Sequence, residues 1–172
     1  MYFECNSLRV SVTAAAAAGD NHASSELHII GGDPLHITAH VVNRESSYTA
    51  NLKSGEREHS LSIPTKPDGF GSMANGGELL LLALATSYCN DLYREARRRD
   101  LTIDAVEVEV MGEYTGEGEP VGSLRYRATA WTSSAKEKVF EVMTHTDTVA
   151  EIHNTLRKAT EIQLIQCEVK ET

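Results

Sequence analysis

The chain is predicted to adopt an α+β fold in which antiparallel sheets surround one long, buried central helix. The first observation is an uninterrupted apolar run, residues 79–85, which follows a Gly-Gly pair and precedes three arginines. A helix that is apolar around its whole circumference must be buried on every side. The second observation is that short segments of alternating apolar and polar residues lie on both sides of this run, at hairpin spacing. Such an order of elements is typical of the α+β class.

Three short strands are expected before the helix, joined as an antiparallel meander. They cover residues 35–42, 47–52 and 59–63. The loop at 64–77 is rich in Pro and Gly, and loops that lead into a buried helix often carry function. Residues 1–34 are expected to form an N-terminal extension, with at most one edge strand at 8–12, and residues 35–172 a single domain.

A hairpin follows the helix. Residues 103–114 alternate strictly, with valines on one face and glutamates on the other, and residues 124–131 return as the partner strand after a glycine turn. Because the glutamate face can meet water, one face of this sheet is expected to be covered and the other solvated.

The next helix is expected to begin at Ser133 or Ser134, with Glu137 completing a capping box. The residues expected on its buried side are Val139, Phe140, Val142 and Met143.

A further helix is expected to be capped by Thr146 or Asp147 and to run through Leu156. A strand at residues 162–169 is expected to close the fold.

Composition excludes several classes of function. The formal net charge of −9 argues against nucleic acid or an anionic membrane surface as a partner. No apolar run approaches the 18 or so residues of a membrane span, and the N-terminus has no secretion-signal pattern. Cys5, Cys89 and Cys167 are odd in number and widely spaced, so reduced thiols in the cytoplasm are the natural interpretation.

No metal or cofactor is expected. His36 and His40 share one face of a strand but lie about 13 Å apart, too far to bind one ion. His145 and His153 lie on separate turns, and no motif with metal-ligand spacing occurs.

The ordered set of motifs resembles the OsmC/Ohr family of osmotically inducible and organic-hydroperoxide-resistance proteins. The similarity lies in the helix entry from Asn75 to Leu80, in the strand beginning at Val106, and in Asn154 to Leu156 before the last strand. It covers about residues 35–169. The resemblance implies an intertwined homodimer with two sites at the subunit interface.

The resemblance also implies a chemistry. In active members a cysteine on the central helix attacks a peroxide, assisted by an arginine and by the glutamate at the helix entry. A second cysteine then resolves the sulfenic acid to a disulfide. The attacking sulfur needs a lowered pKa, since the thiolate is the nucleophile. The resolving thiol protects it from over-oxidation.

Neither sulfur is present in this chain at the matching position. The reactive position corresponds to Ser87 and the resolving position to Ala150. A serine hydroxyl is far too weakly acidic to replace a thiolate without a dedicated base, and alanine cannot replace sulfur at all.

Other site residues match to different degrees. Glu78 corresponds to the family glutamate, although a carboxylate at a helix start is also stabilised by the helix dipole alone. Lys66 is the basic residue nearest to the expected arginine, and Arg44 or Arg57 would have to reach in. His153 could line a pocket with Ser87.

Cys89 has two interpretations. It is either a displaced reactive thiol or a small buried apolar residue, which is the common state of a free cysteine. Two residues along a helix correspond to about 200° of rotation, so Cys89 should face away from Ser87.

Two hypotheses of function follow. In the first, the protein is an OsmC-like dimer, related to hydroperoxide reductases of oxidative-stress defence, with lost or altered peroxidase chemistry and a retained interface pocket for a small apolar molecule. In the second, it is an active thiol-dependent organic hydroperoxide reductase with Cys89 as catalytic sulfur, assisted by Glu78 and an external thiol. The residues favour the first, and the usual function of the family favours the second.

Overall fold

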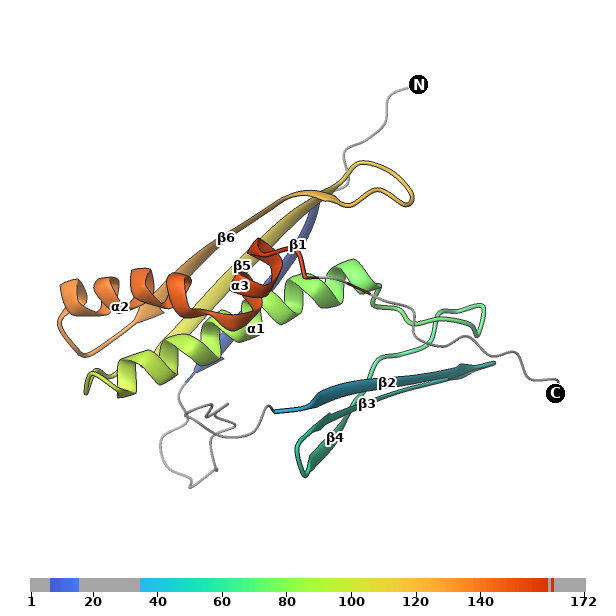
Figure 1. Cartoon of the computed structure of the whole chain (residues 1–172), viewed down its shortest axis with the longest axis horizontal. Helices are drawn as coiled ribbons and strands as arrows, with labels where there is room; N and C mark the ends of the chain where they lie inside the picture. The colour runs from blue at the N-terminus through green and yellow to red at the C-terminus, as the bar shows by residue number, and fades with distance from the viewer. Residues whose placement is uncertain (1–6, 16–34, 161, 163–172) are drawn as a thin grey trace.

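Two antiparallel three-stranded sheets and three helices make up the described part of the chain, residues 7–15, 35–160 and 162 of a computed structural model (Figure 1). The elements are β1 (Ser7–Ala15), β2 (Ile37–Arg44), β3 (Ser47–Ser54), β4 (Arg57–Leu61), α1 (Gly76–Arg97), β5 (Ala105–Tyr114), β6 (Val121–Trp131), α2 (Lys136–Val149) and α3 (Glu151–Arg157). The predicted α+β class is confirmed.

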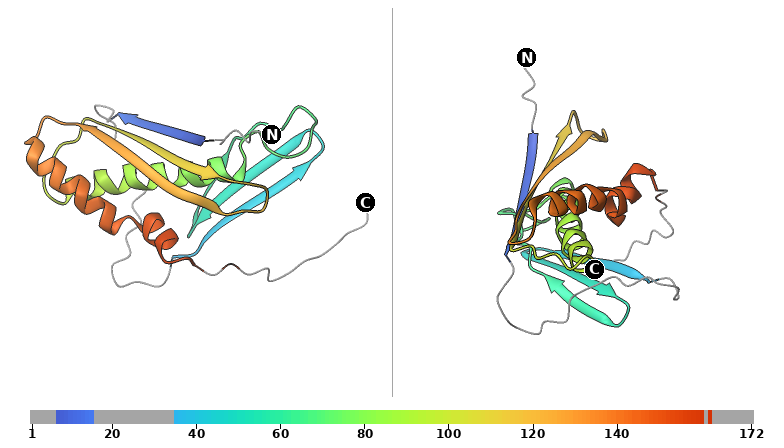
Figure 2. Two further views of the ribbon diagram at one scale, coloured as in Figure 1. Left: turned by 90° about the horizontal axis from the view of Figure 1, so that it is seen from above. Right: turned by 90° about the vertical axis from the view of Figure 1, so that its left-hand side faces the viewer.

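The core lies between α1 and the sheet with strand order β1-β5-β6. Val106, Val108 and Val110 of β5 are at most 1% exposed and face the helices, whereas Glu107 faces solvent. Figure 2 shows α1 and α2 on the same face of this sheet. The predicted hairpin, with one covered and one solvated face, is therefore present. β1 pairs along its whole length with β5 and forms an edge of the sheet.

Two glycines permit the close approach of α1 to β5. A Cβ atom on Gly77 would lie 2.8 Å from the hydroxyl oxygen of Tyr114, and one on Gly112 would lie 3.3 Å from a methyl group of Leu81. Both distances are shorter than ordinary van der Waals contacts, so larger residues would push the helix off the strand.

A capping box begins α1. The Asn75 side chain accepts a hydrogen bond from the backbone N–H of Glu78 at 2.9 Å, and Oε2 of Glu78 accepts one from the N–H of Asn75 at 2.7 Å. Two of the free N–H groups at the helix start are thereby satisfied.

One side of α1 is less covered than the other within the single chain. Its buried residues face the β1–β5–β6 sheet and the other helices, whereas Ala83 and Thr86 are exposed, and Leu79, Leu80 and Leu82 are half-buried. The prediction that α1 is buried on every side is therefore not met within the single chain, and it stays a prediction for an assembly of chains.

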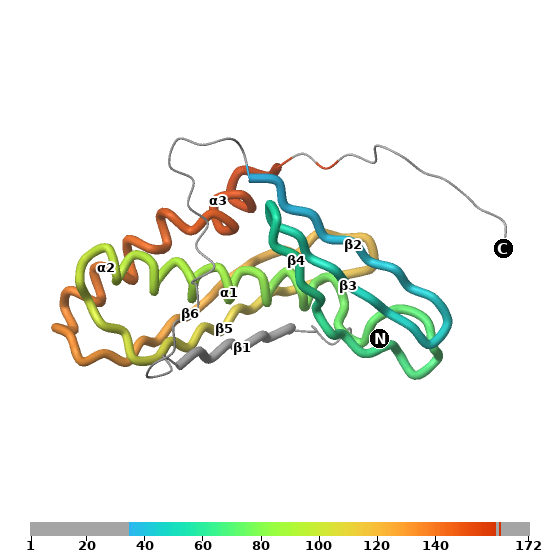
Figure 3. Tube along the Cα trace, turned by 90° about the horizontal axis from the view of Figure 1, so that it is seen from below, coloured from blue at the N-terminus to red at the C-terminus, as the bar shows by residue number. Residues whose placement is uncertain are grey.

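The second sheet, β2-β3-β4, lies on the side of α1 opposite to the first sheet (Figure 3). Its strands make no contact with the other described helices or strands. Ile37, Val41 and Leu61 share one face of it by register and are 60%, 51% and 40% exposed.

Three expectations about the start of α2 are wrong. Ala135 is its N-cap residue, without a side-chain cap, and the hydroxyl of Ser134 instead accepts a hydrogen bond from the N–H of Thr102 at 2.9 Å. No capping box with Glu137 forms. Phe140 is 69% exposed rather than buried, since Val139 and Val142 occupy the face that meets the core.

The end of this helical region also differs from the prediction. Thr146 and Asp147 lie inside α2 and cap nothing, because the helix continues to Val149. The break comes at Ala150, whose extended backbone (ψ 115°) separates α2 from α3. The predicted strand at 162–169 lies outside the described residues except for residue 162, which is not in a strand.

Candidate functional site

Ser87 and Cys89 project from different sides of α1. Cys89 is buried in the core that α1 forms with β5 and α2. Ser87 is half-buried, and its hydroxyl donates a hydrogen bond to Oδ2 of Asp91 at 3.2 Å, one turn later. This separation agrees with the rotation expected from helix geometry.

The surroundings of Cys89 favour a protonated thiol. Burial raises the pKa of this thiol to about 11. A peroxide-attacking cysteine requires the opposite, a thiolate favoured by nearby positive charge. At neutral pH the Cys89 side chain therefore behaves as a small packing residue, and its catalytic role stays a prediction.

A buried ion-pair cluster continues along α1 from Ser87. Nη1 of Arg94 lies 2.8 Å from Oδ1 of Asp91 and 3.2 Å from Oε1 of Glu151 on α3. Burial, and then the negative charge of Glu151, raise the pKa of Asp91 to about 6, although Arg94 and the Ser87 hydroxyl act in the opposite direction. Ser87, which the resemblance predicts to be the reactive position, is thus hydrogen-bonded to a carboxyl group.

Glu95 is the centre of a second group of contacts. Its carboxylate oxygens lie 2.8 Å from guanidinium nitrogens of Arg98 and Arg99 and 3.5 Å from Nε2 of His145. Burial alone would raise the pKa of Glu95, but the hydrogen bond from Arg99 and the charge of Arg98 hold it below its usual range.

The sequence analysis did not predict these ion pairs. Their signal was the spacing of three and four residues between Asp91, Glu95 and the arginines that follow.

At the helix entry, Glu78 is committed to the capping box with Asn75. Lys66 is exposed in the preceding loop, and within the described residues no ion pair joins it to Glu78. The single chain does not bring these two predicted site residues together.

Ala150 and His153 lie at and after the junction of α2 and α3. Ala150 is fully buried. One turn later the His153 ring packs against two tyrosine rings that also contact each other, with centroid distances of 5.1 Å to Tyr126 and 6.1 Å to Tyr88. Neither ring nitrogen of His153 has a hydrogen-bond partner in the described part of the chain, and the residue is 6% exposed.

An ion pair beside His153 joins α3 to α2, and a hydrogen bond joins the same Asp147 carboxylate to β6. The Tyr126 hydroxyl donates to Oδ1 of Asp147 at 2.5 Å, and Nη2 of Arg157 lies 2.7 Å from the same oxygen. A second guanidinium nitrogen of Arg157 donates to the Asp147 carbonyl at 2.8 Å. Burial alone would raise the pKa of Asp147, but these hydrogen bonds hold it below its usual range.

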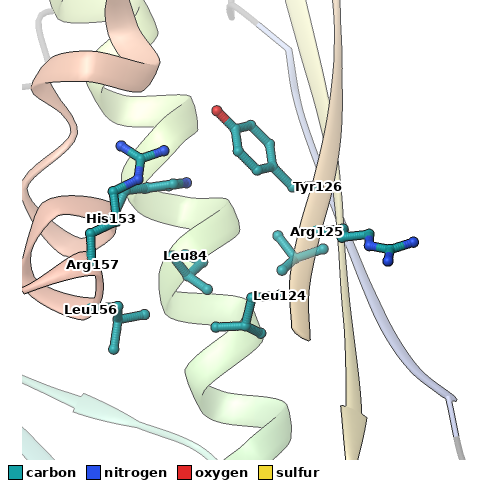
Figure 4. Close-up of a pocket in the computed structure, with 8 residues that line it drawn as sticks. Leu84, Leu124, Arg125, Tyr126, His153, Leu156 and Arg157 are labelled. Carbon is teal, nitrogen blue, oxygen red and sulfur yellow. The ribbon is translucent and has the colours of Figure 1, made fainter. Parts of the chain in front are cut away.

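These contacts border a cavity of about 250 Å³ between α1, α3 and the β5–β6 hairpin (Figure 4). The residues that line it are Leu84, Val110, Leu124, Arg125, Tyr126, His153, Leu156 and Arg157. Of the predicted site residues, His153 lines this cavity, while Ser87, Cys89, Ala150, Glu78 and Lys66 do not. Sequence reasoning missed Tyr126, which its inward position on a strand could have suggested, and the Asp147–Arg157 pair, for which a ten-residue separation gives no local signal.

Comparison with known proteins agrees with this architecture. A family model described as "OsmC-like protein" matches residues 69–165. This match covers more than half of the chain, and the chain therefore belongs to the OsmC-like family.

A solved structure shows the same fold. The chain is similar to an OsmC-like protein from Mycoplasma pneumoniae, at 21% identity and a TM-score of 0.50, over 73% of this chain and 88% of that one. It is also similar to an OsmC-like hydroperoxide resistance protein from Jannaschia sp. CCS1, at 12% identity and a TM-score of 0.45, over 79% and 93% of the two chains. At 21% identity, the similarity to the Mycoplasma pneumoniae protein shows a shared fold and nothing more. No curated protein matches the chain.

Two further observations concern the described residues alone. They contain no group of three or more His, Cys, Asp or Glu side chains arranged to hold a metal ion. None of their helices combines the length and hydropathy needed to cross a bilayer.

The Asp91 carboxyl predicts a pH dependence of stability. The pKa of Asp91 is higher in the native chain than the value near 3.9 of an unfolded one. The contribution of this carboxyl to the stability of the native state is therefore complete below about pH 4 and is lost as the pH rises through 6. Between pH 4 and 7 the wild type should lose on the order of 1–3 kcal/mol of unfolding free energy relative to Asp91→Asn. Urea denaturation at each pH measures this difference. Asp104→Asn, at an exposed position, is the control, and parallel profiles for wild type and Asp91→Asn would contradict the assignment.

Proposed function

We propose that this chain is an OsmC-like homodimer, related to the hydroperoxide reductases of oxidative-stress defence, whose peroxidase chemistry is lost or altered. In this proposal it keeps a pocket for a small apolar molecule and acts in the cytoplasm without a metal or cofactor. The net charge of −9 supports the exclusion of nucleic acid as a partner.

The observation that carries the proposal is the hydrogen bond from Ser87 to Asp91. A nucleophile at the matched reactive position would need nearby positive charge to stabilise its anion. Here the group in contact is a carboxyl, and the nearby guanidinium of Arg94 is held in ion pairs with Asp91 and Glu151. Ala150, at the matched resolving position, is fully buried and offers no sulfur.

The alternative proposal is an active hydroperoxide reductase that uses Cys89. It requires the Cys89 thiol to ionise near neutral pH and to meet peroxide. The raised pKa of this buried thiol, to about 11, weighs against both.

Peroxide treatment separates the two proposals. We expect no sulfenic acid and no mixed disulfide at Cys89 after the reduced protein is incubated with millimolar cumene hydroperoxide. Peptide mapping by mass spectrometry reads Cys5, Cys89 and Cys167 separately, and the guanidinium-unfolded chain serves as the control for an accessible thiol. Rapid, stoichiometric oxidation of Cys89 in the folded protein would establish the alternative.

The homodimer is supported by the uncovered apolar face of the β2–β3–β4 sheet. Ile37, Val41 and Leu61 expose their side chains together, and no described helix or strand of the same chain covers them. Part of α1 is likewise exposed or half-buried in the single chain. Apolar surfaces of this kind are covered by association, at a gain of about 25 cal/mol per Å².

The dimer predicts an effect of one charge on this face. Val41→Asp should shift the protein toward monomer in size-exclusion chromatography with light scattering, because the carboxylate would have to be buried in the interface. Thr38→Asp lies on the same strand but on the opposite face, and should leave the mass of the dimer unchanged. A monomeric wild type would refute the dimer.

A further inference from the structure

We propose that the cavity between α1, α3 and β6 binds an uncharged, mainly apolar molecule that carries one hydroxyl group, and that His153 recognises this hydroxyl. The inference rests on the proposed binding of a small apolar molecule and adds its chemical class and the residue that selects it.

The apolar walls of the cavity favour a ligand whose main part is apolar. Leu84, Val110, Leu124 and Leu156 come from four different elements, α1, β5, β6 and α3, and provide most of the apolar lining. A cavity of about 150 Å³ lined by such residues holds benzene. The volume of about 250 Å³ therefore accommodates an aromatic ring with a short substituent.

The polar groups around the cavity are already paired, with one exception. The Tyr126 hydroxyl donates to Asp147, and Arg157 binds both the carboxylate and the carbonyl of Asp147. The Arg125 side chain points away from the cavity to the other side of β6 (Figure 4). His153 is the exception, since both of its ring nitrogens are buried without a partner in the described chain.

An unpartnered buried imidazole is costly and points to a ligand. Leaving a buried polar group without a hydrogen bond costs about 1–3 kcal/mol, and native proteins contain few such groups. A neutral imidazole offers one N–H donor and one acceptor nitrogen. A hydroxyl group, which both donates and accepts, matches either nitrogen.

The charges nearby favour a neutral ligand over an anion. Arg157 and Asp147 neutralise each other at 2.7 Å. Burial, and then the positive charge of Arg157, lower the pKa of His153, so its ring is uncharged at neutral pH. A carboxylate would thus enter an apolar cavity without a free cation to pair with.

Three matched probes test the inference by isothermal titration calorimetry. These are 4-ethylphenol, ethylbenzene, which lacks the hydroxyl, and 4-ethylbenzoate, which replaces it with an anion. We expect 4-ethylphenol to bind about tenfold more tightly than ethylbenzene, because only the phenol satisfies the imidazole. The benzoate should bind most weakly.

Equal affinity for 4-ethylphenol and ethylbenzene would overturn the role of His153 while leaving the binding of an apolar molecule intact. Absence of binding by all three probes would overturn both. Tightest binding by the benzoate would show that Arg157 selects the ligand, contrary to the inference.

Variants locate the recognition group. His153→Phe keeps a ring in place but removes both nitrogens, so it should lose the preference for 4-ethylphenol and keep the affinity for ethylbenzene. His36→Phe, at an exposed position directly before β2, is the matched control and should behave as wild type.

A measurement on the wild type does not depend on the folding of a variant. The ring nitrogen resonances of His153 in ¹H–¹⁵N spectra should shift on addition of 4-ethylphenol more than those of the other histidines. Unchanged His153 resonances at saturating phenol would contradict the inference.

Discussion

Packing of one side of α1 against the β1–β5–β6 sheet is the constraint on which the rest of the structure depends. Leu81 and Leu92 are fully buried in this contact, together with Val106 and Val108 of β5. Burial of each such side chain contributes about 1.5–3 kcal/mol, so the rotation of the helix about its axis is strongly fixed. That rotation places Cys89 in the core and Ser87 outside it.

Because of this rotation, the side chains on the two sides of α1 have different surroundings. On the core side, apolar surroundings keep the Cys89 thiol protonated. On the other side, Ser87 begins a chain of polar contacts through Asp91 and Arg94 to Glu151 of α3. Ordinary helix periodicity thus separates the sulfur of Cys89 from Ser87, which the sequence resemblance predicts to be the reactive position.

Local patterns predicted the fold well where short-range forces decide it. The apolar run at residues 79–85 predicted a helix where α1 lies, and the valine alternation predicted the β5–β6 hairpin. The prediction failed at Asp147, which is a residue type common at helix N-caps but lies within α2. Its carboxylate is held by Tyr126, which is 21 residues away in the sequence, so a tertiary contact overrides the local preference.

The candidate site was predictable only in part. The resemblance directed attention to Ser87, Ala150 and His153, and helix spacing carried the signal for the Asp91–Arg94 pair. The cavity beside His153 could not be predicted, because it arises from the distance at which α3 packs from β6.

The pH dependence of Cys89 alkylation tests the central claim most directly. Iodoacetamide is applied to the folded protein between pH 6 and 11, and the rate of modification at Cys89 is read by peptide-resolved mass spectrometry. The account predicts slow modification at neutral pH and a rise only as the pH approaches about 11, the pKa of the buried thiol. Rapid modification at neutral pH, with a midpoint below that of an ordinary cysteine near 8.5, would contradict it.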